Sequence, residues 1–235
     1  EFWNRENLYP ALGFEKWYDE EYFGEDEIIG IGLSDKIFFQ RSHDILRKLH
    51  NSGQLFYAQL VTLTSHHPFT LPDEDNTLQL PQRFDESIVG DYLNVAHYVD
   101  KQLKAFFDQL KAESLLENSV VVLYGDHQGL QENTLSVDEK ALLNSLIGHE
   151  YNFPLLIHAE GENLTGHYEA VGGQIDILPT VANLVGLSLD HFIHFGQDLL
   201  NSENNLFGMR YYMPYGSFFY NDTVYMTQTS YEDGV

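Results

Sequence analysis

The sequence predicts an α/β fold, and three observations support this prediction. Short apolar runs at 55–64, 119–125 and 153–158 are rich in β-branched or aromatic residues and bounded by turn residues, as buried strands are. A long segment between the first two runs has apolar residues at helical spacing. Hydrophobic residues make up 43% of the 235 residues, enough for a substantial core. Strands that alternate with helices favour a parallel or mixed sheet with helices on both faces.

The elements follow one another in a regular order. A helix is predicted over 36–49, before the first strand, and a longer one between the first and second strands. The apolar stripe of the longer helix has i, i+3, i+4, i+7 spacing and comprises Tyr92, Val95, Ala96, Val99, Leu103, Phe106, Phe107 and Leu110. A further helix is predicted to start at Asp176, whose carboxylate would cap it, with Pro179 in its first turn and Gly186 at its end.

The composition changes after residue 189. Aromatic residues crowd a stretch that is broken by turn residues at 214–216 and 221–222, which favours antiparallel hairpins. No repeat or linker is evident. We therefore expect a single domain over 1–235, with an α/β core at 1–190 and a small antiparallel appendage at 191–235.

Charge and composition exclude several classes of function. Twelve basic and thirty-six acidic residues give a net charge of −24, which repels nucleic acid and anionic membranes and attracts divalent cations. The sequence has no cysteine, which excludes disulfides, thiolate metal sites and a cysteine nucleophile. No apolar run approaches the ~20 residues that a membrane-spanning helix needs. Without an initiating Met or a signal peptide, the sequence is interpreted as part of a longer protein.

The clearest chemical motif is Asp126-His127, directly after the predicted strand at 119–125. In open α/β sheets, ligands bind beyond the carboxyl ends of the strands. A carboxylate oxygen beside an imidazole nitrogen suits manganese, zinc or iron better than calcium. The alternative from this dipeptide alone is that Asp126 caps a loop or a helix and His127 is a turn residue.

Two further motifs could bind phosphate. His66 and His67 follow the predicted strand at 55–64, where an imidazole could hydrogen-bond a phosphate oxygen or act as a general acid. Near the start of the chain, Arg5 offers a planar fork for phosphate and Trp3 an apolar wall. Without context, a packed loop turn and plain surface packing are the commoner roles of such residues.

Taken in order, four segments resemble the lipoteichoic acid synthase family. They are Phe-Trp-Asn-Arg at 2–5, Leu-Thr-Ser-His-His-Pro-Phe-Thr at 63–70, Tyr-Gly-Asp-His at 124–127 and Gly-Gln-Ile-Asp-Ile-Leu-Pro-Thr at 173–180. Segments 33–39 and 194–199 also match in family order. The resemblance covers nearly the whole chain and implies the C-terminal part of an extracellular catalytic domain with the alkaline phosphatase and sulfatase fold.

The resemblance also implies an activity and a site. Members move glycerol phosphate from phosphatidylglycerol onto a growing polymer, outside a bacterial cell and on a membrane anchor that would lie upstream of this chain. By motif position, Asp126 and His127 resemble two ligands of a Mn²⁺ ion. His66, Arg5 and Trp3 resemble the residues that hold the glycerol-phosphate head group. His67 stands where the family has an aromatic residue.

The nucleophilic threonine of the family and an acidic metal ligand would also lie upstream, so no catalytic nucleophile is expected here and the fragment alone should be inactive. Metal-dependent phosphodiesterases, phosphatases and sulfatases of the same fold remain alternatives, as do a glycerol-phosphate-binding module without catalysis and a primase that adds only the first unit. The acidic composition is unusual for an enzyme with an anionic lipid donor. We expect Arg5 and the metal to form a small positive focus within the negative surface.

Overall fold

The computed structural model describes residues 4–131, 134–146, 153–160, 165–203, 205–208, 213–221 and 223–235. The chain forms two compact units. The first unit comprises Glu1–Ser119 and His127–Glu150, and the second comprises Val120–Asp126 and Tyr151–Val235. The prediction of a single domain with a boundary at residue 190 stays a prediction.

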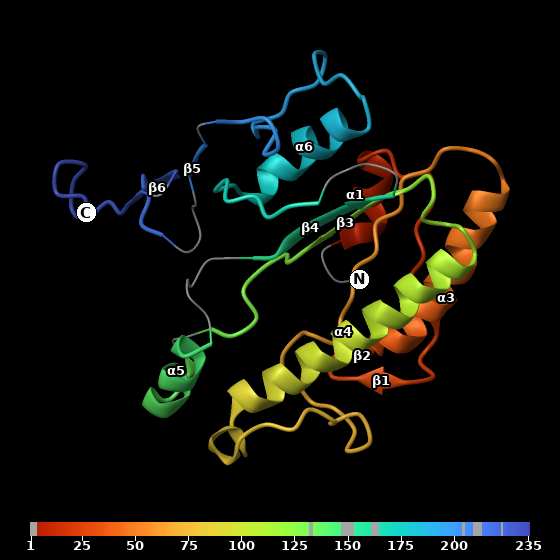
Figure 1. Ribbon diagram of the computed structural model, residues 1–235, viewed down its shortest axis with the longest axis horizontal. Helices are drawn as coiled ribbons and strands as arrows, with labels where there is room; N and C mark the ends of the chain where they lie inside the picture. Colours follow the sequence, from red (N-terminus) through yellow and green to blue (C-terminus); the bar gives the residue numbers. More distant parts are fainter. Residues whose placement is uncertain are drawn as a thin grey trace. The chain divides into compact units, whose positions relative to one another are not determined.

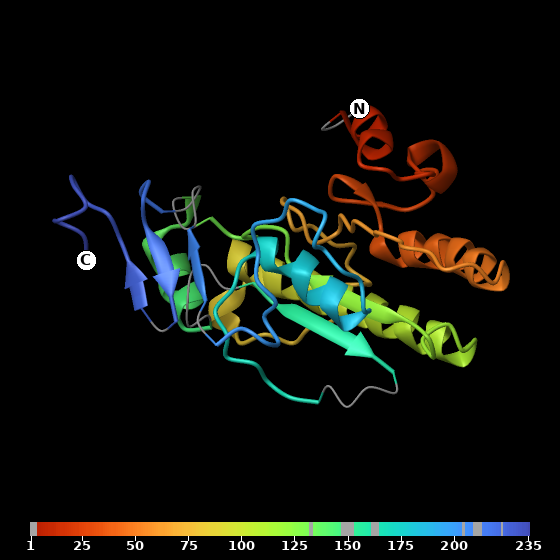
Figure 2. The same cartoon turned by 90° about the horizontal axis from the view of Figure 1, so that it is seen from above.

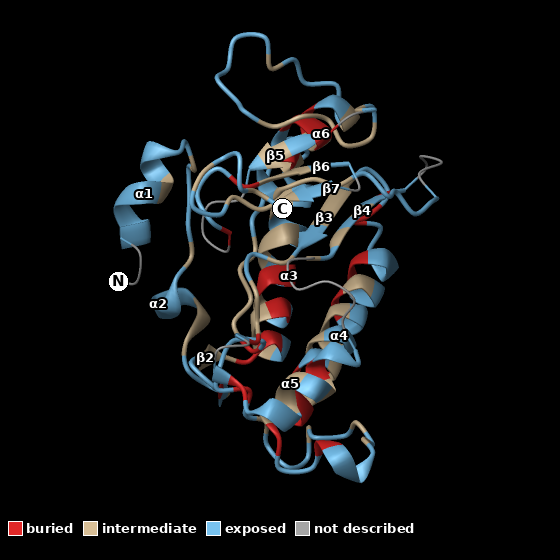
Figure 3. Cartoon of the chain, turned by 90° about the vertical axis from the view of Figure 1, so that its left-hand side faces the viewer, coloured by how far each residue is buried: buried red, intermediate tan, exposed pale blue. Residues whose placement is uncertain are grey.

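Two long helices form the centre of the first unit. Helix α3 (Asp35–Asn51) begins at Ser34, whose Oγ accepts a hydrogen bond from the Ile37 N–H, and α4 (Ile88–Ala112) begins in the same way at Ser87. The helices pack through stacked rings of Phe39 and Phe106, with centroids 4.8 Å apart. Figure 3 shows buried residues on both helices. Burial of these apolar faces stabilises the pair.

Shorter elements complete the first unit. They are α1 (Arg5–Ala11), α2 (Glu20–Phe23), the antiparallel pair β1 (Ile28–Ile29) and β2 (Gly32–Leu33), η2 (Gln82–Phe84) and α5 (Val137–Asn144). Helix α5 packs near the start of α4 over a core cluster of Phe69, Phe84, Val89, Val95, Leu130, Leu135 and Leu143. Because Phe69 belongs to this cluster, the loop that carries His66 is anchored in the core three residues further on.

The second unit is built on an antiparallel strand pair. Strand β3 (Val120–Tyr124) pairs with β4 (Leu155–Ala159) in the register from Val120↔Ala159 to Tyr124↔Leu155. The short helix η4 (Gln174–Asp176) leads into α6 (Ile177–Leu184), which lies beside this pair (Figure 1). Strands β5 (Leu206–Gly208), β6 (Phe218–Tyr220) and β7 (Thr223–Tyr225) form a separate antiparallel sheet, visible near the C-terminus in Figure 2.

The structure confirms the α/β class and most predicted elements. The helices at 36–49 and 92–110 are α3 and α4, and the strands at 119–125 and 153–158 are β3 and β4. The C-terminal hairpins form as predicted, and Gly186 follows α6 in the left-handed conformation, with φ of 73°. Among the described residues, no helix has both the length and the apolar character to cross a bilayer.

Three local predictions are wrong. Residues 55–64 form no strand, and Leu55 is fully exposed, because no described strand pairs with this segment to satisfy its main chain. The strand pairs of the described residues are antiparallel, so these residues do not form the parallel or mixed sheet that the alternation predicted. Asp176 stands at the start of α6, but its side chain makes no capping hydrogen bond there.

Candidate active site

His66 lies on an exposed turn of the first unit. Its N–H donates to the carbonyl oxygen of Leu63 at 3.0 Å, which closes the turn, and its Nδ1 lies 2.9 Å from the carbonyl oxygen of His67. When Nδ1–H donates to a carbonyl, a neutral ring carries a lone pair on Nε2 and a protonated ring carries a second N–H there. His66 therefore presents Nε2 for contact with a ligand. The neighbouring ring of His67 packs edge-on against Phe69, with centroids 5.6 Å apart.

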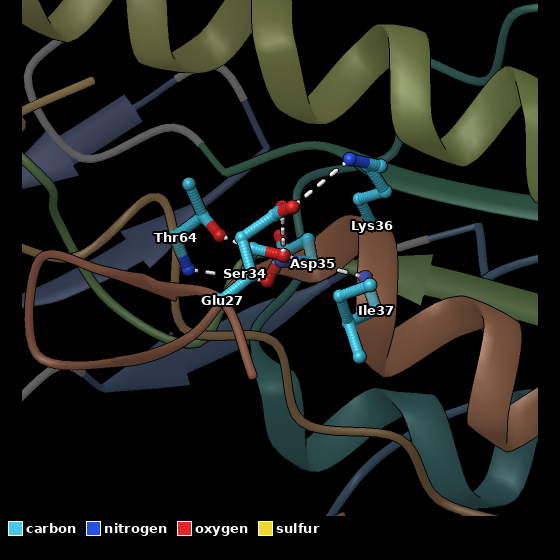
Figure 4. Close-up of polar contacts among 6 residues, drawn as sticks. All are labelled: Glu27, Ser34, Asp35, Lys36, Ile37 and Thr64. Carbon is cyan, nitrogen blue, oxygen red and sulfur yellow. Dashed lines mark hydrogen bonds and ion pairs between the residues drawn. The ribbon is translucent and has the colours of Figure 1, made fainter. Parts of the chain in front are cut away.

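A reciprocal set of hydrogen bonds, here called the Asp35–Thr64 clasp, fixes the chain just before this turn. Oδ1 of Asp35 accepts from the N–H groups of Leu63 at 3.0 Å and Thr64 at 3.1 Å. Oγ1 of Thr64 accepts in return from the Asp35 N–H at 2.8 Å (Figure 4). Asp35 is 0% exposed and Thr64 1%, so water cannot replace these bonds. The clasp ties the start of α3 to the loop of His66.

Burial raises the pKa of the Asp35 carboxyl group, and the hydrogen bonds from Leu63 and Thr64 lower it in part. Oδ1 takes both main-chain bonds, whereas Oδ2 is buried without a hydrogen-bond partner among the described residues. A buried carboxylate that accepts only on one oxygen is costly to keep charged. The burial of Asp35 in the clasp therefore costs electrostatic free energy when its carboxyl group is charged.

The residues on either side of Asp35 connect it to the surface. Oγ of Ser34 donates to Oε1 of Glu27 at 2.6 Å, and Nζ of Lys36 lies 2.9 Å from Oε2 of the same carboxylate (Figure 4). The Ser34 hydrogen bond, followed by that of Lys36, holds the pKa of Glu27 below its ordinary value. Burial raises the pKa of nearby Tyr98 to about 12, so its hydroxyl stays protonated.

The first unit also brings His127 beside His66. The two rings are nearly perpendicular, at 86°, and their centroids lie 6.0 Å apart. Nδ1 of His127 lies 3.0 Å from the carbonyl oxygen of Gln128, which again favours a lone pair on Nε2. Both side chains are exposed. Two histidines that are 61 positions apart in sequence, 127 − 66, therefore lie side by side.

Asp126 directly precedes His127 and belongs to the second unit, just beyond β3. The side-chain amide of Gln174 donates to the carbonyl oxygens of Gly125 at 2.8 Å and Asp126 at 2.7 Å. These carbonyls follow the end of the β3–β4 ladder, whose last main-chain bond runs from the Gly125 N–H to the Pro154 oxygen. Gln174 therefore continues the support of the chain beyond the strand.

The donor chemistry of Asp126 and His127 fits a divalent transition metal. A carboxylate oxygen and an imidazole Nε2 are ligands that manganese accepts, and the tautomer favoured in His127 supplies that nitrogen. Within the described residues, no group of three or more His, Asp or Glu side chains could enclose a metal ion. Two ligands make a weak site, so further ligands would have to come from elsewhere.

The other predicted ligand-binding residues are placed as follows. Arg5 is the first residue of α1 and is exposed. Trp3 lies outside the described residues. The assignment of Arg5, Trp3 and His66 to a head-group site, and of Asp126 and His127 to a metal site, stays a prediction.

Sequence reasoning missed Asp35 and Gln174, which bind the main chain close to His66 and at Asp126, respectively. Both belong to segments that carry the family resemblance, at 33–39 and 173–180, yet neither was given a role. An aspartate after a serine indicates a helix start, and a glutamine after two glycines indicates a turn. Their partners lie 28 to 49 positions away, at Leu63 and Gly125, and no local pattern reveals such pairs.

Comparison with known proteins places this geometry in a family. The model of the sulfatase family matches residues 1–187. Lipoteichoic acid synthase of Staphylococcus saprophyticus is 36% identical over 212 residues, which cover 87% of this chain and 32% of that protein. Lipoteichoic acid synthase 1 of Bacillus subtilis is 35% identical over 210 residues, with the same coverage of 87% and 32%. The chain thus spans about a third of the length of these relatives.

Two solved structures resemble the fold of this chain. The crystal structure of the lipoteichoic acid synthase LtaP from Listeria monocytogenes matches all of this chain and 59% of its own, with a TM-score of 0.93 and 38% identity. An alkaline phosphatase superfamily protein from Vibrio parahaemolyticus matches 88% of this chain and 47% of its own, with a TM-score of 0.64. At 20% identity, the second likeness shows the fold alone. The chain has the alkaline phosphatase-like fold and belongs to the sulfatase family.

Proposed function

We propose that this chain is part of a phosphoglycerol transferase that moves glycerol phosphate from phosphatidylglycerol to a growing lipoteichoic acid polymer or its glycolipid primer. The observation that carries the proposal is the match to proteins named lipoteichoic acid synthase along 87% of this chain. The pairing of His66 with His127 supports it, because it joins a predicted phosphate-binding residue to a predicted metal ligand.

The proposed chemistry divides the work among a few residues. Asp126 and His127 would hold Mn²⁺, which supplies charge neutralisation at the phosphodiester. His66, with a proton on Nε2 as well as on Nδ1, would donate from Nε2 to a phosphate oxygen, and Arg5 and Trp3 would hold the rest of the glycerol-phosphate head group. Phosphoryl transfer depends mainly on such positioning and charge stabilisation.

The covalent steps require a threonine that lies upstream of this chain. Its hydroxyl oxygen would bond to phosphorus as the bond to the diacylglycerol oxygen breaks, and diacylglycerol would leave with a proton. The acceptor hydroxyl oxygen would then bond to phosphorus as the bond to the threonine oxygen breaks, and the acceptor's proton would pass to the threonine. Thr64 does not suit the role of this nucleophile, because it is buried and its hydroxyl belongs to the Asp35–Thr64 clasp.

The lipoteichoic acid synthases similar to this chain support a location at the bacterial cell surface, where phosphatidylglycerol and the polymer would meet. An anchor upstream of this chain would hold the catalytic domain at the outer face of the membrane. The fragment by itself would release no product, because its nucleophile would be missing.

The decisive experiment is turnover of fluorescent phosphatidylglycerol by the full-length protein that carries this sequence, with Mn²⁺ added. We expect release of diacylglycerol, and its loss in Asp126→Ala and His127→Ala. His191→Ala, which removes an exposed histidine outside the site, serves as the matched control and should keep full activity. Activity that survives both site substitutions would exclude this site.

A hydrolase is the second candidate, and the match to the sulfatase family over residues 1–187 favours it specifically. Water would then be the acceptor in place of a polymer hydroxyl. The same assay separates the two functions, because a hydrolase releases free glycerol phosphate, whereas a transferase places it on polymer. Cleavage of small phosphate or sulfate esters with no effect on the lipid would favour the hydrolase.

A further inference from the structure

The segment Gly-Gln-Ile-Asp-Ile-Leu-Pro-Thr at 173–180 has no role in the proposed chemistry, yet it contacts the chain at Asp126. Gln174 is the residue that makes the contact. One amide nitrogen donates to two successive carbonyl oxygens, those of Gly125 and Asp126. Carbonyls beyond the end of a strand have no ladder partner, so a side chain that binds both defines the path of the main chain there.

Gln174 itself is held from behind by a buried network. Asp176 is 4% exposed, and its two oxygens accept from the N–H groups of Gly173 and Gln197, each at 2.7 Å. Oγ1 of the fully buried Thr180 donates to the carbonyl oxygen of Asp176 at 2.6 Å and accepts from the Leu199 N–H at 2.9 Å. Hydrogen bonds to a buried carboxylate are strong, so Asp176 fixes the turn that carries Gln174.

Tight packing restricts this turn further. A Cβ atom at Gly196 would collide with the carbonyl oxygen of Ile175, and one at Gly172 would collide with the side chain of Leu199. The backbone of residues 172–176 therefore lies directly against the segment around Gly196. Such a framework leaves little freedom for Gln174, even though its side chain is exposed.

We propose that Gln174 is a positioning residue that holds the main chain of Asp126 in the orientation its carboxylate needs to bind the metal ion. The proposal rests on the metal site of the proposed function. The side-chain amide of Gln174 donates to the main chain of Gly125 and Asp126, so Gln174 would act on the metal through Asp126. The buried pair of Asp176 and Thr180 acts one step further away, as the support of Gln174. Through these contacts, the 173–180 motif would fix the main chain at Asp126.

The test measures Mn²⁺ binding directly. The full-length protein is freed of metal and titrated with MnCl₂ by calorimetry, as wild type and as Gln174→Met, which keeps the volume but removes the amide donor. We expect the variant to bind Mn²⁺ about three- to tenfold more weakly, as the loss of one or two exposed hydrogen bonds would produce. Its Tm without metal should stay close to that of the wild type, because the lost hydrogen bonds are exposed and water can replace them. Gln228→Ala, at another exposed glutamine of the same unit, should bind as the wild type does.

Asp126→Ala distinguishes the possible failures. Loss of Mn²⁺ binding in Asp126→Ala together with wild-type affinity in Gln174→Met would overturn the positioning role and leave the proposed metal site intact. Unchanged binding in Asp126→Ala would overturn the metal site and with it this inference. An equal fall in affinity in Gln174→Met and Gln228→Ala would also count against the inference, since it would show no specific effect of the contact with Asp126.

Discussion

At the scale of single residues, the site depends on side chains that are not expected to touch the substrate. His66 is exposed, and the hydrogen bond of its ring reaches only the next residue, the carbonyl of His67. The Asp35–Thr64 clasp fixes the main chain two residues before His66. Asp35 and Thr64 are both buried, so water does not compete for these hydrogen bonds. Functional side chains are often exposed on a buried framework, because the framework can be rigid while the reactive atoms stay accessible.

Thr64 allows this support to be tested. Thr64→Val keeps the shape of the side chain but leaves the buried N–H of Asp35 without its acceptor, and we expect the free energy of unfolding to fall by about 1–3 kcal/mol. Thr64→Ser keeps the hydroxyl and loses only a methyl group, worth about 1 kcal/mol. Turnover of phosphatidylglycerol by the full-length protein should fall in Thr64→Val and persist in Thr64→Ser. Equal activity in the two variants would contradict a role of the clasp in placing His66.

At the scale of elements, a carboxylate joins two helix starts in the first unit. Glu139 lies in the first turn of α5, where its carboxylate accepts from the N–H and the Oγ of Ser136 at 2.9 and 2.7 Å. Oε1 of the same group accepts from the N–H of Ile88, the first residue of α4, at 3.3 Å. These bonds satisfy donors that a helix start leaves without partners. Glu139 thus connects the start of α5 to the start of α4, and both helices pack on the core cluster that contains Phe69.

The hydrogen bonds from Ser136, followed by that from Ile88, hold the pKa of Glu139 below its ordinary value of 4.5. A carboxyl group with a lowered folded-state pKa stabilises the fold above its unfolded-state pKa and loses this effect as pH falls through the folded value. We therefore expect Glu139→Gln to lower the Tm at pH 7, and the difference from wild type to narrow as pH falls below 4.5. Asp138→Asn makes the same charge change in the same turn. If it lowers the Tm equally, the hydrogen bonds of Glu139 are not the cause.

The helices and strands show how much of the fold the sequence could predict. Helix α4 was predictable because a helix forms its own main-chain bonds, so an apolar stripe with period 3.6 is sufficient evidence. The segment 55–64 has an equally apolar pattern, but a strand needs a neighbour, and no described strand supplies one. The contact between His66 and His127 was not predicted, and neither was the contact of Gln174 with Gly125, because tertiary packing sets both.

At the scale of the whole molecule, the dominant feature is a net charge of −24, from twelve basic and thirty-six acidic residues. Such a field attracts Mn²⁺ but opposes the approach of an anionic lipid. The proposed transferase therefore needs a local source of positive charge, and Arg5, at the exposed start of α1, is the proposed one. The local effect of such a group can be separated from its effect on net charge only by comparison with another cation.

Lys48 provides that comparison, because it is an exposed cation on α3 outside the predicted head-group site. Arg5→Ala and Lys48→Ala each leave eleven basic residues and a net charge of 11 − 36 = −25. We expect Arg5→Ala in the full-length protein to raise the KM for phosphatidylglycerol about tenfold or more, the loss expected for a charge-assisted hydrogen bond to phosphate, and Lys48→Ala to leave it within about twofold. If both raise the KM alike and added NaCl removes the effect, the lipid responds to the overall field, because salt screens long-range charge more than direct contacts. Arg5 would then have no special place in the site.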